Sequence, residues 1–220
     1  MTPVALITGG QGGLATALRA ELEAQHWQVH APGRDALDVT DAAAVRAGID
    51  GLPRLDLLVH NAGFLRDAPL ARMSEADFAA VLEVHLRGAF LCARAALRPM
   101  LRQGGGHLVF VGSFSALSGP VGQANYAAAK AGLIGLAQSL AAEYGTRGIR
   151  ANVVLPGLLE TPMTAPLLAD PERRRRALAA HTLGRFNTPA EAARFIAFLH
   201  SLPHTSGQVF SLDSRVQPWT

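Results

Sequence analysis

Short apolar runs alternate along the chain with longer segments in which apolar residues recur every three or four positions. The short runs predict buried strands at 3–8, 27–31, 55–61, 107–111, 149–155 and 207–212. The longer segments predict helices at 14–25, 41–51, 74–103, 125–144 and 188–200, with a break in the third near 85–88. Strands that alternate with helices are usually parallel and joined by crossover connections, so the pattern predicts an α/β fold.

Polar residues mark where two of these helices begin. Ser74 is followed three residues later by Asp77, and Thr188 is followed in the same way by Glu191. A pair at this spacing satisfies free N–H groups in the first turn of a helix. The stretch at about 158–182, by contrast, is irregular and rich in Pro and Arg, so we expect it to form a lid. The chain has no internal repeat and no linker, and we expect residues 1–220 to form one domain.

Composition narrows the class of protein. Apolar residues make up 49% of the chain and charged residues 17%, which is enough to build a core and too apolar for a disordered chain. The apolar runs are too short to span a membrane, and the first eight residues lack the basic start of a signal peptide. The one cysteine, Cys92, cannot form an internal disulfide. These features favour a cytoplasmic protein with no membrane partner.

Charged residues and histidines restrict the partners further. The net charge is +3 and the basic residues are scattered apart from 173–176, so we expect no nucleic-acid partner. The run 173–176 is either a solvated lid helix or a binding site for an acidic carrier protein or for the phosphates of coenzyme A. His200 and His204 are four residues apart, but Pro203 interrupts their helix, and we expect no metal site.

Four glycines occupy positions 9, 10, 12 and 13, between the first predicted strand and the first predicted helix. Glycine lets a backbone approach a pyrophosphate closely, and a helix N-terminus supplies free N–H groups and a positive dipole end. An ordinary tight turn would also use these glycines. Ala15 stands where the dinucleotide-binding fingerprint has its last glycine, so the match to that fingerprint is incomplete.

Tyr126 and Lys130 share one face of a predicted helix because they are four residues apart. Every other basic residue except histidine is Arg, so Lys130 is the one lysine of the chain. An ammonium beside a phenol favours the phenolate and lowers the tyrosine pKa, which suits a group that exchanges a proton with a carbonyl or alcohol oxygen. Taken alone, such a pair is more often two solvated helix residues.

Ser113 follows the predicted strand 107–111 and precedes Tyr126 by thirteen residues. Sites in open α/β sheets form at the carboxyl ends of strands, where a hydroxyl group can hold a substrate carbonyl. The alternative is a serine with no role in a loop of Gly and Ser.

The ordered combination of these motifs resembles the short-chain dehydrogenases/reductases from end to end. The resemblance rests on the Gly-rich turn, Asn61-Ala62-Gly63, Ser113, Tyr126, Lys130, and Pro156-Gly157 with Thr161. It is greatest to the members that are like 3-oxoacyl-(acyl-carrier-protein) reductases, through the stretches 122–132 and 183–186. The family implies a single doubly wound Rossmann domain with a parallel sheet.

The resemblance also implies a role for each matched position. Tyr126 would be the general acid/base, Lys130 would lower its pKa and bind the nicotinamide ribose, and Ser113 would orient the substrate oxygen. The other matched positions would bind the cofactor: Gly9, Gly13 and Leu14 at the phosphates; Asp38 and Val39 at the adenine; Asn61, Ala62 and Gly63 beside the adenosine; Pro156, Gly157, Leu159 and Thr161 at the nicotinamide.

The segment after the second strand bears on the choice of cofactor. It reads His30-Ala31-Pro32-Gly33-Arg34, with no acidic residue before Asp35. An acidic side chain here binds the 2′-hydroxyl of NAD, whereas a basic one accepts the 2′-phosphate of NADP. We therefore expect Arg34 to favour NADP(H), with NAD(H) as the alternative if Asp35 reaches the ribose.

Three further positions depart from the family pattern. Many relatives have Asn where this chain has His85, and that Asn supports a proton-relay water; His can also bind water, and it titrates near neutrality. Asp213-Ser214-Arg215 stands where relatives often have Asp-Gly-Gly. The stretch from the second strand to Asp38 is short, so we expect the helix that usually lies between strands two and three to be missing.

These observations predict an NAD(P)-dependent oxidoreductase that transfers a hydride between a nicotinamide cofactor and a small carbonyl/alcohol substrate, such as a ketone or a 3-oxoacyl compound. The alternatives are a sugar-nucleotide-type epimerase or dehydratase, and a cofactor-binding protein with little turnover. An apolar substrate pocket is suggested by Phe114, Leu117, Leu158 and Leu159. The segments 89–101 and 131–142 are apolar on several sides, which predicts a homo-oligomer, either a dimer or a tetramer.

Overall fold

The computed structural model describes residues 1–216. Its centre is a six-stranded sheet in the order β2-β1-β3-β4-β5-β6, in which every pair of neighbouring strands is parallel. The strands are β1 (Val4–Ile7), β2 (Gln28–His30), β3 (Leu57–His60), β4 (Gly106–Val111), β5 (Ile149–Leu155) and β6 (Val209–Ser211). Each lies within two residues of a strand that the sequence predicts, and the doubly wound α/β fold is confirmed.

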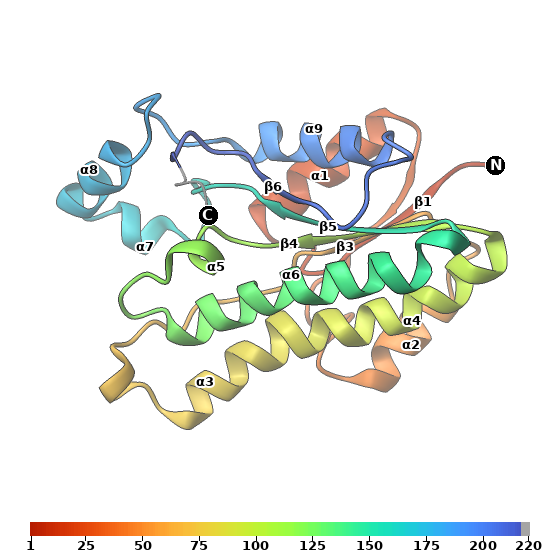
Figure 1. The fold of residues 1–220 in the computed structure, drawn as a ribbon, viewed down its shortest axis with the longest axis horizontal. Coiled ribbons are helices and arrows are strands. Elements are labelled where there is room, and N and C mark those ends of the chain that lie inside the picture. The colour runs from red at the N-terminus through yellow and green to blue at the C-terminus, as the bar shows by residue number, and fades with distance from the viewer. Residues whose placement is uncertain (217–220) are drawn as a thin grey trace.

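Helices cover both faces of the sheet (Figure 1), with α1 and α9 on one face and α2, α4 and α6 on the other. The longer helices are α1 (Gly13–Ala24), α2 (Ala42–Asp50), α3 (Glu75–Leu82), α4 (Gly88–Gln103), α6 (Ala124–Tyr144), α8 (Pro171–Ala179) and α9 (Pro189–His200). The short ones are α5 (Ser115–Ser118), α7 (Ala165–Leu168), η1 (Leu70–Arg72), η2 (Glu83–Arg87) and η3 (Gly145–Arg147).

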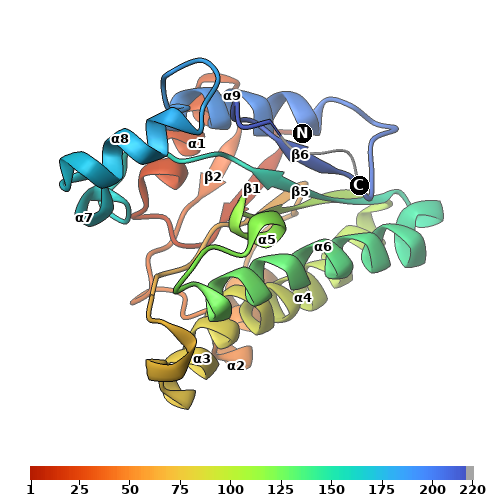
Figure 2. The same ribbon diagram turned by 60° about the vertical axis from the view of Figure 1, so that its left-hand side comes forward.

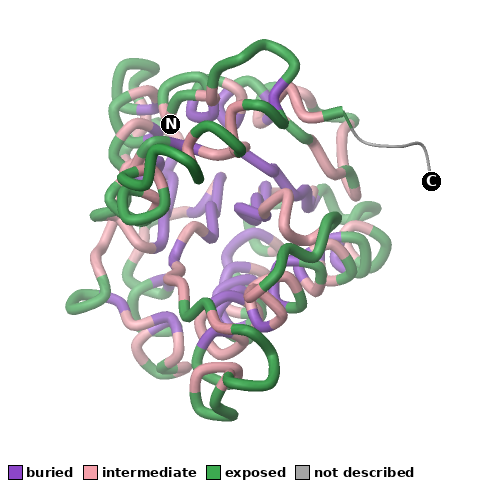
Figure 3. The backbone as a smooth tube through the Cα atoms, turned by 90° about the vertical axis from the view of Figure 1, so that its left-hand side faces the viewer, coloured by how far each residue is buried: buried purple, intermediate pink, exposed green. Residues whose placement is uncertain are grey.

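Two apolar cores result, one on each face of the sheet. Successive residues of a strand point to opposite faces, so Leu58 packs toward α2, α4 and α6 while Val59 packs toward α1 and α9. A strand covered on both faces is apolar at nearly every position, which explains the long apolar runs in the sequence. Figure 3 shows these strands as the buried centre of the molecule.

The predicted capping residues begin their helices. Ser74 Oγ accepts a hydrogen bond from Asp77 N (3.0 Å) at the start of α3. Thr188 and Glu191 form a reciprocal capping box at the start of α9: Thr188 Oγ1 accepts from Glu191 N (3.2 Å), and Glu191 Oε2 accepts from Thr188 N (3.0 Å). The expected break near 85–88 is a π-helical turn, η2, between α3 and α4.

Two connections need correction. Residues 31–41 contain no helix, as the short stretch before Asp38 suggested, but they contain no strand either. The strand that follows β2 along the chain is therefore β3, and α2 connects the two. The expectation that no helix lies between the second and third strands is wrong. The lid region 158–182 is less irregular than its sequence suggests, since α7 and α8 lie within it. Asp170 begins α8 by accepting hydrogen bonds from the N–H groups of Glu172 and Arg173 (2.9 and 3.1 Å).

Candidate active site

The carboxyl ends of β1, β3, β4 and β5 meet at the edge of the sheet that lies to the left in Figure 1. The strand order changes direction at β1 and β3, because β2 lies on one side of this pair and β4 on the other. Such a switch point leaves a crevice beyond the strand ends where ligands bind. The matched sequence motifs all follow strands that end at this edge, except the Tyr126/Lys130 pair, which α6 supplies.

The Gly-rich turn is shaped as a phosphate cradle. Gly9 has φ +67°, and a Cβ added there would lie 2.8 Å from Ala62 Cα; a Cβ on Gly13 would lie 3.0 Å from Thr161 Cγ2. Helix α1 begins directly after the turn, and no side chain caps its N-terminus. Its first N–H groups and its dipole are therefore available to an anion, and the turn fits the pyrophosphate of a dinucleotide.

The end of β3 is tied to this turn through Thr8. Thr8 Oγ1 accepts hydrogen bonds from the N–H groups of Asn61 and Ala62, both at 3.1 Å. Asn61 Nδ2 donates to the carbonyl oxygens of Thr8 (3.2 Å) and Gly9 (3.3 Å). The structure thus brings together the Gly-rich turn and the Asn61-Ala62-Gly63 motif, which are about fifty residues apart in the sequence.

The expected adenosine end lies after β2. A Cβ on Gly10 would lie 1.9 Å from Ala31 O, so the end of β2 packs directly on the Gly-rich turn. Asp38 Oδ1 accepts hydrogen bonds from Thr40 N (2.9 Å) and Oγ1 (2.7 Å), which lower the pKa of Asp38. Arg34 Nε lies 3.3 Å from Asp38 Oδ2, and its side chain is 85% exposed. Arg34 can therefore reach a ligand at this end of the turn.

The expected nicotinamide end is formed by the loop after β5. Gly157 has φ +84°, a conformation that glycine adopts readily. Asn187 Nδ2 donates to Pro156 O (2.9 Å), and Leu159 is buried where it forms a bridge with Asn187. Thr161 N donates to Thr164 Oγ1 (3.0 Å), which turns the chain into α7. These contacts fix the shape of the loop, and Thr161 of this loop lies beside Gly13 in the first turn of α1.

Tyr126, Lys130 and Ser113 come together at the carboxyl end of β4. Lys130 is buried, and its Nζ donates to Val111 O at 2.6 Å and lies 5.6 Å from the centroid of the Tyr126 ring. The Ser113 hydroxyl lies close enough to the Tyr126 side chain to lower its pKa. Helix α6 packs on β4 and β5, so its inward face delivers both Tyr126 and Lys130 to the end of β4.

Burial shifts the pKa values of both groups. Burial raises the pKa of Tyr126 to about 12; the neighbouring Ser113 hydroxyl opposes this shift and the charge of Asp67 adds to it. The direction is opposite to the lowering expected from Lys130, since desolvation of the phenolate outweighs the other effects. Burial lowers the pKa of Lys130 to about 7. In the protein alone it is therefore the pKa of Lys130, and not that of Tyr126, that lies near neutral pH.

Two buried histidines lie behind this pair. Nε2 of His85 lies 2.8 Å from Phe64 O and 3.1 Å from Phe64 N, and the His85 ring packs edge-on against Tyr126 at 5.1 Å. A Cβ on Gly63 would lie 2.1 Å from His85 Cε1, so this glycine makes room for the ring. Burial, followed by the Lys130 charge, lowers the pKa of His85 well below its usual value and that of His60 to about 3.

His85 stands out in the sequence as a departure from the family pattern, whereas His60 does not. The signal for His60 was a polar residue that ends an otherwise apolar buried strand, directly before Asn61. Nδ1 of His85 and Nε2 of His60 have no hydrogen-bond partner among residues 1–216.

A hydrogen-bonded chain that the sequence did not reveal supports Ser113. Ser113 Oγ donates to Ser115 Oγ (3.2 Å), Ser115 Oγ donates to Gln123 Oε1 (2.8 Å), and Gln123 Nε2 donates to Asp67 Oδ2 (2.8 Å). Its members come from three loops, so only the tertiary structure assembles them. The chain fixes the hydroxyl beside Tyr126.

The segment 158–182, which we expect to form a lid, lies beyond the strand ends, where α7 and α8 extend from the sheet (Figure 2). A cavity of about 430 Å³ lies within this segment, lined by Glu160, Thr161, Pro162, Ala165, Leu168, Ala169 and Arg174. Within residues 1–216 no cluster of His, Cys, Asp and Glu side chains is suited to a metal ion. No helix in the same part of the chain has both the length and the apolar character needed to cross a membrane.

Known proteins share both the sequence and the fold. Residues 12–214 match the family model described as enoyl-(acyl carrier protein) reductase. The chain is 42% identical over 184 residues to 3-oxoacyl-(acyl-carrier-protein) reductase FabG of Thermotoga maritima, which covers 80% of this chain and 74% of that protein. It is 36% identical to the 3-oxoacyl-(acyl-carrier-protein) reductase of Synechocystis, over 96% of this chain and 95% of that one. The crystal structure of TT0495 from Thermus thermophilus superimposes with a TM-score of 0.92 at 32% identity, covering 97% of this chain and 98% of TT0495.

Fold, site and relatives together define an oxidoreductase that uses a nicotinamide cofactor and transfers a hydride between it and a small carbonyl/alcohol substrate. The chain belongs to the short-chain dehydrogenase/reductase family.

Proposed function

We propose that this protein is a reductase of ketones or 3-oxoacyl compounds, in which Tyr126 is the general acid, Ser113 orients the substrate oxygen and Lys130 binds the cofactor ribose. The observation that carries the proposal is the meeting of these three side chains at the carboxyl end of β4. We also take residues 1–220 as one domain with 158–182 as its lid, and a cytoplasmic location, which the free, buried Cys92 fits.

The mechanism follows from the protonation states. The bound nicotinamide supplies the hydride that reduces the carbonyl carbon. Tyr126 is protonated at neutral pH, because burial holds its pKa at about 12, so it can hydrogen-bond the substrate oxygen and donate its proton as that oxygen gains charge. Lys130, when charged, stabilises the phenolate that remains. Ser113 holds the oxygen within reach of both.

The cofactor-binding assignments extend the same proposal. Gly9, Gly13 and Leu14 would bind the phosphates, and Asp38 and Val39 the adenine. The other two groups would be Asn61, Ala62 and Gly63 beside the adenosine, and Pro156, Gly157, Leu159 and Thr161 at the nicotinamide. The uncapped N-terminus of α1 and the contact between Gly13 and Thr161 support this path along the edge of the sheet.

Turnover tests the proposed reaction. We expect purified protein to oxidise NADPH in the presence of a ketone or a 3-oxoacyl thioester, and Tyr126→Phe to lower kcat by about 100-fold or more while leaving cofactor affinity nearly unchanged. Net NADPH consumption would distinguish a reductase from an epimerase that regenerates its cofactor and from a cofactor-binding protein without turnover. Wild-type kcat in Tyr126→Phe would contradict the mechanism.

We further propose that NADP(H) is preferred and that Arg34 binds its 2′-phosphate. The support is the position of Arg34 beside the Gly-rich turn: a Cβ on neighbouring Gly33 would lie 2.8 Å from the Gln11 side chain. Arg34→Ala should weaken NADPH binding about 10-fold and leave NADH binding unchanged, because only NADPH carries the extra phosphate. Arg46→Ala, an exposed arginine of α2, is the control. An NADH preference that Arg34→Ala does not alter would refute the assignment.

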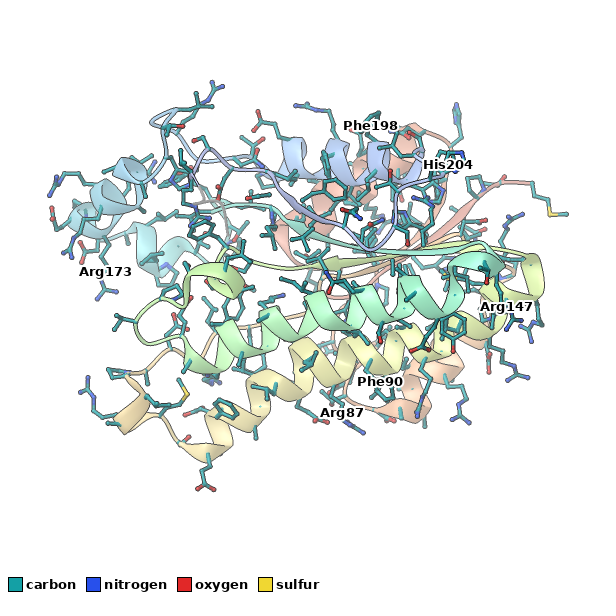
Figure 4. All side chains as sticks on the ribbon, viewed as in Figure 1. Arg87, Phe90, Arg147, Arg173, Phe198 and His204 are labelled. Atoms are coloured by element: carbon teal, nitrogen blue, oxygen red, sulfur yellow. The ribbon has the colours of Figure 1, made fainter. Side chains whose placement is uncertain are left out.

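We also propose that the protein is a homo-oligomer whose subunits contact one another through the outer face of α4. The apolar pattern of α6 is weaker support than expected, because Leu133, Ala137 and Leu140 are buried in the core. Phe90 of α4 is 43% exposed, on the helical layer below the sheet in Figure 4. Light scattering should give a multiple of the chain mass for the wild type and a lower mass for Phe90→Glu. Phe198→Glu, an exposed residue of α9 on the other face, should leave the mass unchanged.

A further inference from the structure

The segment that follows β6 contacts two walls of the site. Asp213 packs closely on the loop after β5, since a Cβ on Gly157 would lie 2.7 Å from Asp213 Cβ. Thr182, at the end of the lid, donates to Ser214 O through its backbone N (3.2 Å) and its Oγ1 (2.8 Å). Residues 213 and 214 therefore join the nicotinamide loop to the lid.

Arg215 reaches a third wall, beside Ser113. Its guanidinium carbon lies 3.8 Å from the centroid of the Phe114 ring, and Phe114 directly follows Ser113. Arg215 Nε (2.7 Å) and Nη2 donate to Asp213 Oδ2, and Arg215 N donates to Asp213 Oδ1 (3.1 Å). His181 Nε2 lies 3.8 Å from the same Oδ2. The Asp213 side chain is 1% exposed and the Arg215 side chain 19%, so the cation is fixed and largely shielded from water.

One edge of this guanidinium is left for a ligand. A guanidinium carries five N–H donors in one plane, and those of Nη1 have no hydrogen-bond partner in the part of the chain that the structure describes. The Asp213 carboxylate holds one edge of the guanidinium, and the Phe114 ring stacks on its face. The remaining edge is therefore already oriented, and a ligand that binds there would cost the side chain little further conformational freedom. Such a fixed edge matches the two oxygens of a carboxylate, and the attraction is stronger where water is largely excluded.

We propose that Arg215 is a specificity residue that binds a carboxylate carried by the same molecule as the reacting carbonyl. The inference rests on the proposed function and narrows its substrate class to oxo acids. The competing explanation is that Arg215 only neutralises buried Asp213 and fixes the turn after β6. These explanations differ in outcome, because a structural role affects charged and uncharged substrates equally.

A matched pair of substrates separates the two explanations. Acetoacetate and ethyl acetoacetate share the same ketone and differ in charge. We expect the wild type to reduce the acid with the higher kcat/KM. Arg215→Gln should lower kcat/KM for the acid about 10-fold or more and change that for the ester by less than about 2-fold. Arg147→Gln removes an exposed cation of η3, at the end of the molecule away from the site (Figure 4), and should change neither value. Equal losses for acid and ester in Arg215→Gln would overturn the proposal.

A second variant guards against misfolding. Arg215→Gln leaves a buried carboxylate without its cation, which destabilises a protein. The double variant Asp213→Asn/Arg215→Gln removes both charges and keeps the hydrogen-bonding groups. It should unfold at a temperature close to that of the wild type and still lose the preference for the acid. A folded double variant that keeps the preference would also overturn the proposal.

Binding in the absence of turnover gives an independent measurement. In Tyr126→Phe loaded with NADPH, calorimetry should detect binding of acetoacetate, and Tyr126→Phe/Arg215→Gln should bind it about 10-fold more weakly. Equal affinity in the two proteins would refute the role of Arg215. If the wild type reduces neither compound, the proposed function fails, whereas this measurement still decides whether Arg215 recognises a carboxylate.

Discussion

The carboxyl edge of the sheet places His60 and His85 near Lys130, and the opposite, amino edge places His107 and His200 near Arg150. In both pairs burial is the main cause that lowers the histidine pKa, and the nearby cation adds to it. The rings of His107 and His200 lie 5.6 Å apart. Each edge thus buries two histidines beside a cation, and the two edges differ because that cation is a lysine at one and an arginine at the other.

Arg150 is used to build structure. Its Nη1 donates to Leu202 O (2.9 Å) and its Nη2 to His200 O (2.7 Å), where α9 ends. Burial lowers the pKa of Arg150, yet a guanidinium stays charged in proteins. Within the described residues 1–216, Lys130 makes one hydrogen bond, to Val111 O, and burial brings its pKa to about 7. Arg150 is therefore a permanently charged cap, whereas the charge of Lys130 depends on the pH near neutrality.

The largest expected effect comes from Lys130→Arg. The variant keeps the positive charge but introduces a bulkier group with no pKa near neutrality, so we expect kcat to fall about 100-fold or more. Steady-state kinetics at saturating cofactor would measure the loss. Thermal unfolding serves as the control for folding, and turnover near that of the wild type would show that the type of cation is unimportant at this edge.

Arg150→Lys is the reciprocal test at the amino edge. An ammonium cannot reach the carbonyl groups that the guanidinium fork spans, so the free energy of unfolding should fall by about 1–3 kcal/mol. Urea unfolding would measure it, and kcat of the folded enzyme should not change. Arg147→Lys, an exposed neighbour in η3 (Figure 4), should alter stability by less than about 0.5 kcal/mol. Equal effects of the two substitutions would contradict the capping role.

The pH dependence of reduction sharpens the contrast. Because the pKa of Lys130 is lowered to about 7, its charge is present below that pH and lost above it. We expect kcat/KM to fall about tenfold per pH unit above neutrality, since kcat/KM reports the free enzyme. Arg150→Lys should show the same profile as the wild type. A profile that is flat from pH 6 to pH 9 would contradict this assignment.

The last prediction concerns stability in acid, where the effect arises only below neutral pH. The pKa of His200 is about 4 in the folded protein, below its usual value, so the unfolded chain binds the proton first. Its contribution to stability is complete above about pH 6.5 and is lost as the pH falls toward 4, at up to about 1.4 kcal/mol per pH unit. His200→Gln should make the decline measured by urea unfolding less steep without changing kcat. An unchanged slope would refute the linkage.

Much of what the sequence predicted correctly depends on residues that lie close together along the chain. The capping box of Thr188 and Glu191, the six strands and the π-helical break before α4 all depend on residues a few positions apart. The Tyr126/Lys130 pair was found because helical spacing alone puts the two side chains on one face. The lowered pKa expected for Tyr126 was wrong, since burial cannot be read from a spacing of four.

The parts that the sequence did not reveal depend on contacts between distant segments. Arg150 caps a helix that ends fifty residues later, and Arg215 stacks on Phe114 about one hundred residues away. His60 is the last residue of β3 and lies beside the backbone of η2, which follows it by more than twenty residues. Periodicity determined the elements and their order, because apolar spacing decides which face of a helix or strand can be buried. Only the tertiary structure decided which buried polar groups meet, because their pKa values and free donors depend on neighbours that the sequence places far apart.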